Sequence, residues 1–289
     1  MGNYFVYPVP KSSYEESQED PTLIFVPNKI EVSSGGQLLC MEKRRISAEI
    51  PCRYIPCQSH VSPYLIIFFH GNSEDIGNNL SLVLSSFSRR FGMNVLCPEY
   101  PTYGIYKKKD PSLTMDEAIL QDARVVIEYC HRRLRFDYQN IILIGRSLGS
   151  SVATKLANQF NVRGLVLISP FTSIRKAAEK IAGTFLAKAI PDIFKSIEYI
   201  EHVKSPVLFI HGRQDTLIPY EMAIELYEKT KKPKFLKIND RMTHNQFRIE
   251  SDVFTPIQGF MIDQLDLESY LLPSIDEIHN TEGEEDLDA

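Results

Sequence analysis

The sequence predicts an α/β fold with a mostly parallel sheet and helices on both faces. Short apolar runs alternate with longer amphipathic segments along most of the 289 residues. Strands separated by helices require right-handed crossovers, which produce parallel pairing. The apolar runs are nearly continuous, as expected for strands that are covered on both faces. With 43% hydrophobic residues, the chain can fill one core, so we expect a single main domain.

The predicted elements alternate regularly from residue 64 onward. Strands are expected at 64–69, 94–98, 140–144, 164–168, 206–210 and 233–238, and helices at 80–91, 114–133, 151–160 and 220–230. Residues 30–56 are expected to form two or three short strands around a turn at 33–36. They would supply an antiparallel edge to the sheet.

The predicted domain runs from residue 28 to residue 270 and contains a short helical cap insert at about 171–203. Residues 1–27 are polar and interrupted by prolines, and we expect an extended arm whose apolar end, 23–26, docks on the domain. Residues 271–289 are expected to form an acidic, disordered tail.

Charge and cysteine content exclude several classes of function. The net charge of −5 arises in the tail, because residues 276–289 hold seven of the 37 acidic residues and no basic one. Basic clusters elsewhere are short and scattered, so we expect no nucleic-acid partner. The five cysteines are an odd number, and Cys52 and Cys57 lack a second pair. We therefore expect reduced thiols, no metal and no organic cofactor.

The amino-terminal residues do not resemble a signal peptide, because no basic flank precedes them and two prolines interrupt them. The apolar run at 64–69 is too short to span a bilayer. We expect a cytoplasmic protein and leave peripheral membrane contact open.

The most informative stretch runs from Ile141 to Ala153. An apolar run leads through Gly145-Arg146-Ser147-Leu148-Gly149 into a helical pattern. This strand, G-x-S-x-G turn and helix are the signature of a nucleophile elbow, in which a serine projects above the sheet. The two glycines leave room for a turn that is too tight for side chains.

A serine hydroxyl is a weak nucleophile and needs a histidine base that an acid orients. The expected chain order is serine, acid, histidine. Asp215 follows one predicted strand and His244 follows the next, both at the carboxyl edge where ligands bind. We predict Ser147 as nucleophile, Asp215 as orienting acid and His244 as general base. Asp240 is the second choice for the acid, although it shares the loop of His244.

The other histidines fit the role of base less well. His60, His70 and His131 precede the nucleophile, and we expect His70 to be a structural hydrogen-bonding residue. His211 is expected to bond within its own turn and His202 to end a helix, while His279 lies in the tail.

Two backbone amides are expected to stabilise the negative charge of the intermediate. One is the amide of Leu148, directly after the nucleophile, and the other comes from the loop after an earlier strand. The segment Phe69-His70-Gly71-Asn72 fits this second position, so we predict the amide of Asn72.

With these residues in place, the chain resembles the α/β-hydrolase superfamily and, more narrowly, the α/β-hydrolase domain-containing 17 group of protein depalmitoylases. The resemblance covers about residues 30–247 and implies the α/β-hydrolase fold with a triad at Ser147, Asp215 and His244. It rests on the motifs Cys52-Arg53-Tyr54-Ile55, His70-Gly71-Asn72, Asp75-Ile76-Gly77, Tyr100-Pro101-Thr102-Tyr103-Gly104, Gly145-Arg146-Ser147-Leu148-Gly149, Ser169-Pro170-Phe171-Thr172-Ser173, His211-Gly212 with Asp215, and His244-Asn245.

Several residues depart from that group. The group carries a cysteine-rich, acylated amino terminus, whereas the first cysteine here is Cys40, inside the body. Met1-Gly2-Asn3 is a partial match to a myristoylation site, because Val6 stands where Ser or Thr is preferred. Glu99 replaces the usual Asp, Pro101-Thr102 replaces Ser-Gly, and Arg146 replaces Gln beside the nucleophile.

Substrate choice is expected to depend on the insert at 171–203, where apolar residues recur at helical spacing with Lys176, Lys180 and Lys188 between them. This helix either packs as a cap on the body, or forms an acyl-chain wall or a membrane-facing patch. The predicted pocket residues are Tyr103, Arg146 and Phe171.

The predicted function is a serine hydrolase that cleaves acyl esters or thioesters through an acyl-enzyme. Palmitoyl-protein thioesterase is the leading hypothesis, and the expected partner is an acylated protein or a lipid-like ester. A lipid or small-molecule carboxylesterase is the alternative, followed by a serine peptidase. A non-catalytic binding module with the same fold is the hypothesis from a different class.

Overall fold

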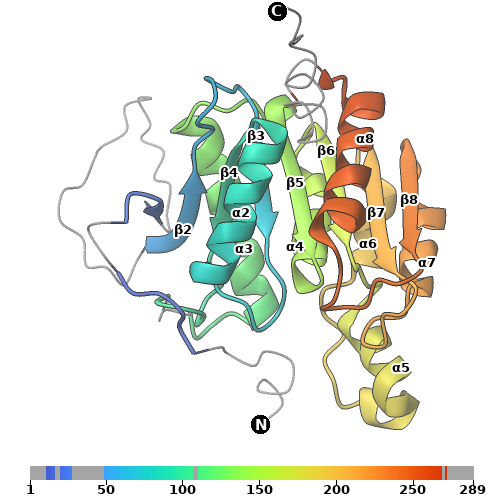
Figure 1. Ribbon diagram of the computed structural model, residues 1–289. Helices are drawn as coiled ribbons and strands as arrows, with labels where there is room; N and C mark the ends of the chain where they lie inside the picture. The colour runs from blue at the N-terminus through green and yellow to red at the C-terminus, as the bar shows by residue number, and fades with distance from the viewer. Residues whose placement is uncertain (1–10, 17–19, 28–48, 107–109, 269–270, 272–289) are drawn as a thin grey trace, which may run out of the picture.

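The computed structural model describes residues 11–16, 20–27, 49–106, 110–268 and 271. Figure 1 shows one central sheet with helices in front of it and behind it. The strands are β1 (Leu23–Pro27), β2 (Glu49–Ile55), β3 (Leu65–Phe69), β4 (Asn94–Pro98), β5 (Ile141–Arg146), β6 (Gly164–Ile168), β7 (Val207–Gly212) and β8 (Lys234–Asn239). The α-helices are α2 (Asn78–Phe91), α3 (Met115–Arg132), α4 (Leu148–Gln159), α5 (Ile174–Ala187), α6 (Ser196–Tyr199), α7 (Glu221–Lys229) and α8 (Thr255–Leu265). Short 3-10 helices lie at Tyr138–Asn140 and Ile200–His202, and a π-helix at Ile249–Phe254 leads into α8.

The eight strands form one sheet in the order β1-β2-β4-β3-β5-β6-β7-β8. The pairs β1–β2 and β2–β4 are antiparallel, and all later neighbours are parallel. The predicted mostly parallel sheet with an antiparallel edge is therefore confirmed. The chain passes from β3 to β4 on one side and returns to β5 on the other. In open α/β sheets such a switch point marks where ligands bind, at the carboxyl ends of the strands.

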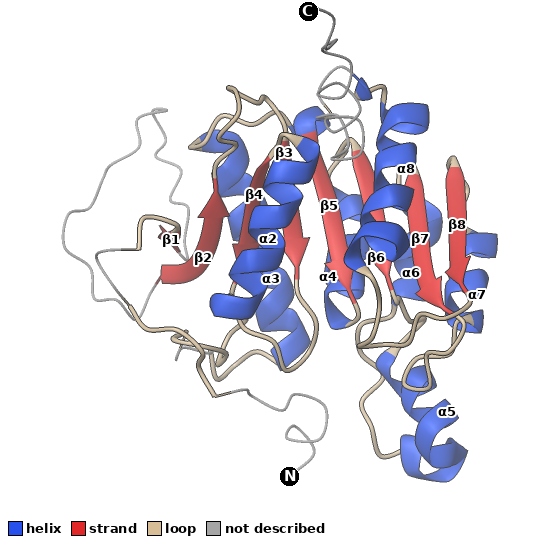
Figure 2. Ribbon diagram, in the orientation of Figure 1, coloured by secondary structure: helices blue, strands red, loops and turns tan. Residues whose placement is uncertain are grey.

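Alternate residues of the central strands face opposite helix layers. In β5, Ile141 and Leu143 belong to the core on one face, and Ile142 and Ile144 belong to the core on the other. Helices α3, α4 and α7 cover the first face, while α2 and α8 cover the second (Figure 2). This double cover explains why the central strands are apolar throughout, because both faces of each strand are removed from water.

Most predicted helix and strand bounds are confirmed within a few residues. Helix α3 begins directly after Thr114, whose backbone amide donates to the Glu117 carboxylate at 2.9 Å. This contact satisfies an amide that the first turn of a helix leaves unpaired. Helix α4 begins at Leu148, three residues before the predicted start, because the chain turns into the helix directly after Ser147.

One helix, α8, was not predicted from the sequence. Helix α8 follows the loop of His244 and lies in front of β6 and β7 in Figure 1. Its buried residues, Ile257, Phe260, Met261 and Leu265, recur at helical spacing. They complete the second apolar layer together with α2.

The insert after β6 is helical, as predicted, but it is not one helix. Gly183 interrupts α5 with a φ of 82°, a value that glycine adopts at little cost, and α6 follows after a loop. Figure 1 shows α5 projecting beyond the carboxyl ends of the strands.

The apolar end of the predicted arm docks on the domain as the edge strand β1, where Leu23–Pro27 pairs with β2. Predictions for the turn at 33–36, for Cys40, for the amino-terminal Met1-Gly2-Asn3, for His279 and for the acidic tail beyond residue 271 lie outside the described residues.

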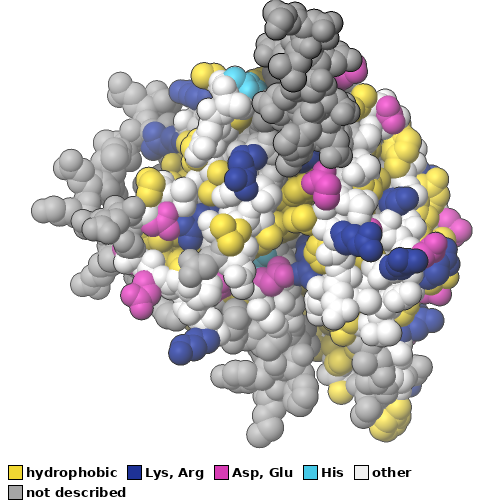
Figure 3. Space-filling view, in the orientation of Figure 1, with side chains coloured by type: hydrophobic (Ala, Val, Ile, Leu, Met, Phe, Trp, Pro, Cys, Tyr) yellow, Lys and Arg dark blue, Asp and Glu magenta, His cyan; other side chains and the backbone are white. Residues whose placement is uncertain are grey.

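Three further observations concern the helices, the cysteines and the surface charge of the described residues. None of their helices is both long enough and apolar enough to cross a bilayer. The thiols of Cys52, Cys57, Cys97 and Cys130 are free. On the face drawn in Figure 3, basic and acidic side chains are intermixed rather than segregated.

Candidate active site

Ser147 occupies a strained turn between β5 and α4. Its backbone has a φ of 51° and a ψ of −118°, which a residue with a side chain rarely adopts. The turn is held because the Ser147 amide donates to the Ile168 carbonyl at 2.9 Å, while the Ser150 hydroxyl donates to the Ser147 carbonyl at 2.6 Å. The surrounding structure therefore holds the serine in the conformation of a nucleophile elbow, as predicted.

The two glycines of the elbow are required by the space around them. A Cβ on Gly145 would lie 2.3 Å from the Gly149 carbonyl oxygen. A Cβ on Gly149 would lie 2.1 Å from the Phe69 carbonyl oxygen at the end of β3. Glycine at both positions lets α4 approach the sheet closely enough to set Ser147 beside the loop that follows β3.

The structure brings together the three residues that were predicted to form a triad. The imidazole of His244 lies between the other two, with Nε2 3.1 Å from Ser147 Oγ and Nδ1 2.7 Å from Asp215 Oδ2. Asp215 follows β7 and His244 follows β8, so both come from the carboxyl edge of the sheet. All three residues are buried, with relative exposures of 6–8%.

The carboxylate of Asp215 is held by several donors. The amides of Leu217 and Ile218 donate to Oδ1 at 3.0 and 2.7 Å, and His211 Nε2 lies 3.3 Å from Oδ2. Burial would raise the pKa of Asp215, but hydrogen bonds from His211, His244 and the Ile218 amide outweigh it and hold that pKa well below its usual range. Asp215 is therefore ionised at neutral pH and can orient an imidazole.

His211 keeps one tautomer beside this carboxylate. Its Nε2 lies 2.9 Å from the Ile218 carbonyl oxygen as well as near Asp215, so that nitrogen faces two acceptors and carries a proton. The prediction that His211 bonds within its own turn is confirmed. Its additional contact with Asp215 was not predicted.

The loop after β3 lies beside the elbow and carries the predicted oxyanion residue, Asn72. Tyr103 donates from its hydroxyl to Asn72 Oδ1 at 2.6 Å, and Tyr100 donates to the His70 carbonyl at 2.8 Å. The ring of Tyr100 stacks on that of His70, with centroids 4.0 Å apart. Two aromatic residues that follow β4 therefore hold the backbone from which the Asn72 amide would act.

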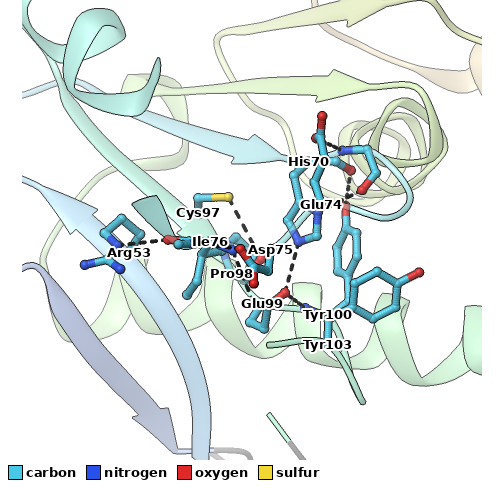
Figure 4. Close-up of polar contacts among 12 residues, drawn as sticks. Arg53, His70, Glu74, Asp75, Ile76, Cys97, Pro98, Glu99, Tyr100 and Tyr103 are labelled. Atoms are coloured by element: carbon cyan, nitrogen blue, oxygen red, sulfur yellow. Dashed lines mark hydrogen bonds and ion pairs between the residues drawn. The ribbon is translucent and has the colours of Figure 1, made fainter. Parts of the chain in front are cut away.

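Arg146 connects the two loops on either side of the elbow. Its guanidinium bonds the Glu74 carboxylate, the His244 carbonyl at 3.0 Å and Asn245 Oδ1 at 2.9 Å. Glu74 in turn accepts from the Gly71 amide at 2.7 Å (Figure 4 shows Glu74 beside His70). These contacts make Arg146 a brace between the loop after β3, called the oxyanion loop below because it carries the predicted donor Asn72, and the loop of His244.

The other two predicted pocket residues are buried. Tyr103 is fully inaccessible and supports Asn72, and Phe171 is 2% exposed and packs in the core on the α4 face. Arg146 differs from them, because 13% of its side-chain surface is exposed. Their predicted role as substrate contacts stays a prediction.

The other residues considered for the base or the acid lie away from Ser147. His60 is exposed next to Ser59, and the ring of His131 stacks on Tyr138. His202 ends a 3-10 helix and is exposed, as predicted. Asp240 is exposed and pairs with Arg213 at 2.8 Å, so it does not face His244.

Two cavities in the described part of the chain lie away from the three residues, since Ser147, Asp215 and His244 line neither of them. One, of about 450 Å³, lies at the amino ends of β4 and β5. The other, of about 380 Å³, lies between α5 and α7 and has mainly charged lining residues. The described ranges contain no group of three His, Cys, Asp or Glu side chains arranged to hold a metal ion.

Comparisons with known proteins agree with this geometry. The family model described as "Serine hydrolase (FSH1)" matches residues 108–244, which include the elbow and His244. The chain is 27% identical over 215 residues to alpha/beta hydrolase domain-containing protein 17C of Xenopus tropicalis and of Homo sapiens. That alignment covers 74% of this chain and 66% and 62% of the two relatives, so the match spans less than two thirds of their length.

Solved structures share the fold at low sequence identity. The Pyrococcus furiosus esterase Pf2001 superposes with a TM-score of 0.66 at 16% identity, covering 90% of this chain and 99% of that one. Est1E of Butyrivibrio proteoclasticus gives a TM-score of 0.60 at 17% identity, covering 85% and 99%.

Sheet order, elbow and structural likeness together define the class, that of the α/β-hydrolase fold, and residues 108–244 are similar to a serine hydrolase family. Within that class, its sequence is similar to the alpha/beta hydrolase domain-containing protein 17 group.

Proposed function

We propose that Ser147, His244 and Asp215 form the catalytic triad of an acyl hydrolase that removes a long acyl chain from a protein thioester. The observation that carries this proposal is the imidazole of His244, within hydrogen-bonding distance of both the Ser147 hydroxyl and the Asp215 carboxylate. The geometry suits a general base whose tautomer is set by the carboxylate.

The reaction proceeds in two steps. The Ser147 oxygen attacks the acyl carbonyl as its proton passes to His244 Nε2, and the amides of Leu148 and Asn72 stabilise the oxyanion. The carbon–sulfur bond then breaks, and the proton on His244 passes to the departing thiolate. In the second step, water loses a proton to His244 and attacks the acyl-enzyme, which releases the fatty acid and restores Ser147.

Two features support an acyl substrate. Leu217, whose amide donates to Asp215, is 47% exposed, and Phe185 on α5 is 86% exposed. Both belong to segments at the carboxyl edge, where an acyl chain that reaches Ser147 would lie. The resemblance to protein depalmitoylases, with motifs spread along residues 30–247, favours a thioester over other acyl groups.

The proposal includes cytoplasmic location and contact of α5 with a membrane surface. Phe185 lies on a helix that projects from the body, and Lys176, Lys180 and Lys188 are exposed on or next to it. Apolar and basic side chains together favour a bilayer that carries anionic lipids. A palmitoylated protein is held at such a surface, so this contact would bring enzyme and substrate together.

The test compares three substrates with one preparation of the full chain. They are a palmitoyl thioester peptide, p-nitrophenyl butyrate and an unmodified peptide. We expect the highest kcat/KM for the thioester, covalent labelling by a fluorophosphonate, and loss of both in Ser147→Ala. Thermal melting of the variant shows whether it is folded, and Ser86→Ala, which changes a partly exposed serine on α2, is the matched control.

The other outcomes identify the alternatives. Preference for the short ester would indicate a carboxylesterase, and cleavage of the peptide would indicate a peptidase. A folded parent that is neither labelled nor active, and that behaves like Ser147→Ala, would overturn the proposal in favour of a binding module.

A further inference from the structure

The buried carboxylate of Glu99, just after β4, connects the amino-terminal arm to the oxyanion loop. Its Oε1 accepts from the Tyr100 amide at 3.0 Å and lies 3.2 Å from His70 Nε2. Its Oε2 accepts from the Ile76 amide at 3.2 Å. Figure 4 shows His70, Ile76 and Tyr100 around this carboxylate. Glu99 therefore contacts both ends of the loop that carries Asn72.

The ring of His70 is held between Glu99 and a backbone carbonyl. Its Nδ1 lies 2.9 Å from the Gly71 carbonyl oxygen, so both ring nitrogens face acceptors. Burial alone would lower the pKa of His70, but the neighbouring Glu99 carboxylate outweighs it and the net direction is upward. The contact between His70 and Glu99, whose side chains are both fully buried, fixes the residue two positions before Asn72.

The arm supplies the remaining donor to this carboxylate. Tyr14, which is 8% exposed, donates from its hydroxyl to Glu99 Oε2 at 2.9 Å. Burial, reinforced by the Glu99 charge, raises the pKa of Tyr14, so its hydroxyl keeps its proton and donates. The neighbouring Ser13 donates from its amide and its hydroxyl to Asp75 at 2.6 and 2.5 Å.

Ser13 and Tyr14 pack against two glycines of the domain, Gly77 and Gly104, and this packing site is called the seat below. A Cβ on Gly104 would lie 2.6 Å from Tyr14 Cε1, and a Cβ on Gly77 would lie 1.9 Å from Ser13 Oγ. Gly104 also has a φ of 49°, so a side chain there would be strained as well as blocked. Arg53 closes the seat, because its guanidinium lies 5.8 Å from the Tyr14 ring centroid and its Nε donates to the Ile76 carbonyl at 3.1 Å.

We propose that Tyr14 is a positioning residue for the oxyanion loop, and that the docked arm segment at 11–16 holds the loop in its reactive geometry through Glu99 and His70. The proposal rests on the proposed function, since it concerns the same site. The Tyr14 hydroxyl completes the set of donors to a carboxylate that has no access to water. When the Tyr14 hydroxyl is absent, the Ile76 amide is the donor that Glu99 Oε2 retains. The oxyanion loop is then held less firmly, and the position of the Asn72 amide becomes less well defined. An oxyanion donor that is displaced by a fraction of an ångström stabilises the transition state less.

The experiment compares two Tyr→Phe variants of the full chain that each lose one buried hydrogen bond to a carboxylate. Tyr14→Phe removes the donor to Glu99. Tyr106→Phe removes the donor to Asp122 of α3, a bond of 2.8 Å, and is the matched control. The readouts are kcat and KM on p-nitrophenyl butyrate and backbone hydrogen–deuterium exchange of residues 70–77.

For Tyr14→Phe we expect kcat to fall about three- to tenfold with KM within about twofold, since one buried hydrogen bond is lost and only the transition state uses the loop. Exchange in residues 70–77 rises. Tyr106→Phe leaves both readouts at the level of the parent. Ser13→Ala, which changes an exposed residue, gives a smaller rise in exchange and serves as the second variant should Tyr14→Phe fold poorly.

Each contrary result has its own meaning. An active parent with the same kcat in Tyr14→Phe, or an equal fall of kcat in both Tyr→Phe variants, overturns the positioning role of Tyr14. A folded parent that hydrolyses none of the esters overturns the proposed function. In that case the exchange comparison still decides whether Tyr14 holds the loop, because it requires no activity.

Discussion

The loop after β3 and the insert after β6 both leave the carboxyl edge of the sheet, yet they are held very differently. The loop is tied to Glu99, Tyr103 and, through Glu74, to Arg146. The insert carries Phe185 at 86% exposure, and nothing lies within 4 Å of a Cβ built on Gly183. The difference indicates that buried contacts fix the loop beside Ser147, whereas the insert is held less tightly and presents an apolar side chain to solvent.

The largest effect on kcat is expected for Asp215→Asn, in the tightly held part of the site. Asparagine can present an amide to His244 Nδ1 and favour the wrong tautomer, so kcat should fall by roughly three to four orders of magnitude. Steady-state kinetics on p-nitrophenyl butyrate measures it, with melting to check the fold. A fall of less than tenfold would contradict the role assigned to Asp215.

The same variant should change how stability depends on pH. The pKa of Asp215 is lower in the folded chain than in the unfolded chain. Its contribution is therefore fully present above the unfolded value, about 3.9, and is lost as the pH falls below it. Urea unfolding from pH 7 to pH 3 should show a constant difference between parent and Asp215→Asn at high pH, shrinking below about pH 4. A difference that grows on acidification would contradict the depressed pKa.

An intermediate effect is expected when the brace is removed in Arg146→Ala. The Glu74 carboxylate and the His244 carbonyl both lose a donor, so the two loops beside the elbow loosen together. We expect kcat to fall about ten- to one-hundredfold and the free energy of unfolding to drop by about 1–3 kcal/mol.

The control for the brace is Arg213→Ala, which removes an exposed ion pair with Asp240. Exposed pairs contribute little, so its stability should change by less than about 1 kcal/mol and its kcat should not change. Equal effects in the two arginine variants would show that Arg146 is merely another surface charge.

The smallest effect on stability is expected in the insert after β6, for Phe185→Ser. Because this side chain is 86% exposed, the free energy of unfolding should change by less than about 0.5 kcal/mol. Binding to vesicles that contain phosphatidylserine, and the preference for the palmitoyl thioester over p-nitrophenyl butyrate, should both decrease.

Val61→Ser is the matched control, since Val61 is 99% exposed and lines the cavity at the amino ends of the strands. If both variants lower vesicle binding equally, α5 is not the membrane-contacting element. If neither changes the substrate preference, the insert does not select the acyl chain.

Much of the fold could be predicted because it depends on local patterns. The apolar runs of β3 to β8 and the periodicity of α3 specify strands and helices within a few residues of their observed bounds. Helix α8 has the same kind of periodicity and was missed, since the catalytic motifs end before it. The break of α5 at Gly183 was missed because a lone glycine in a helical pattern is compatible with both a continuous and an interrupted helix.

The residues of the candidate site likewise include some that local patterns predict and some that they do not. Ser147, Asp215 and His244 could be named because each follows a predicted strand in the order that the fold requires. Arg146 could be named because its neighbour in sequence is the nucleophile, but its contact with Glu74, 72 residues away, could not be predicted. Tyr14 carries no motif, and its partner Glu99 lies 85 residues away.

The sequence by itself determined the class of fold, the elbow and the identity of the three residues that meet there. These features depend on consecutive residues and on strand order, both of which are written in the chain. Only the tertiary structure decided what holds the site: the arm on Glu99, the brace from Arg146 to Glu74 and the contact of His211 with Asp215. Such contacts join segments that packing alone brings within hydrogen-bonding distance, so no local pattern specifies them.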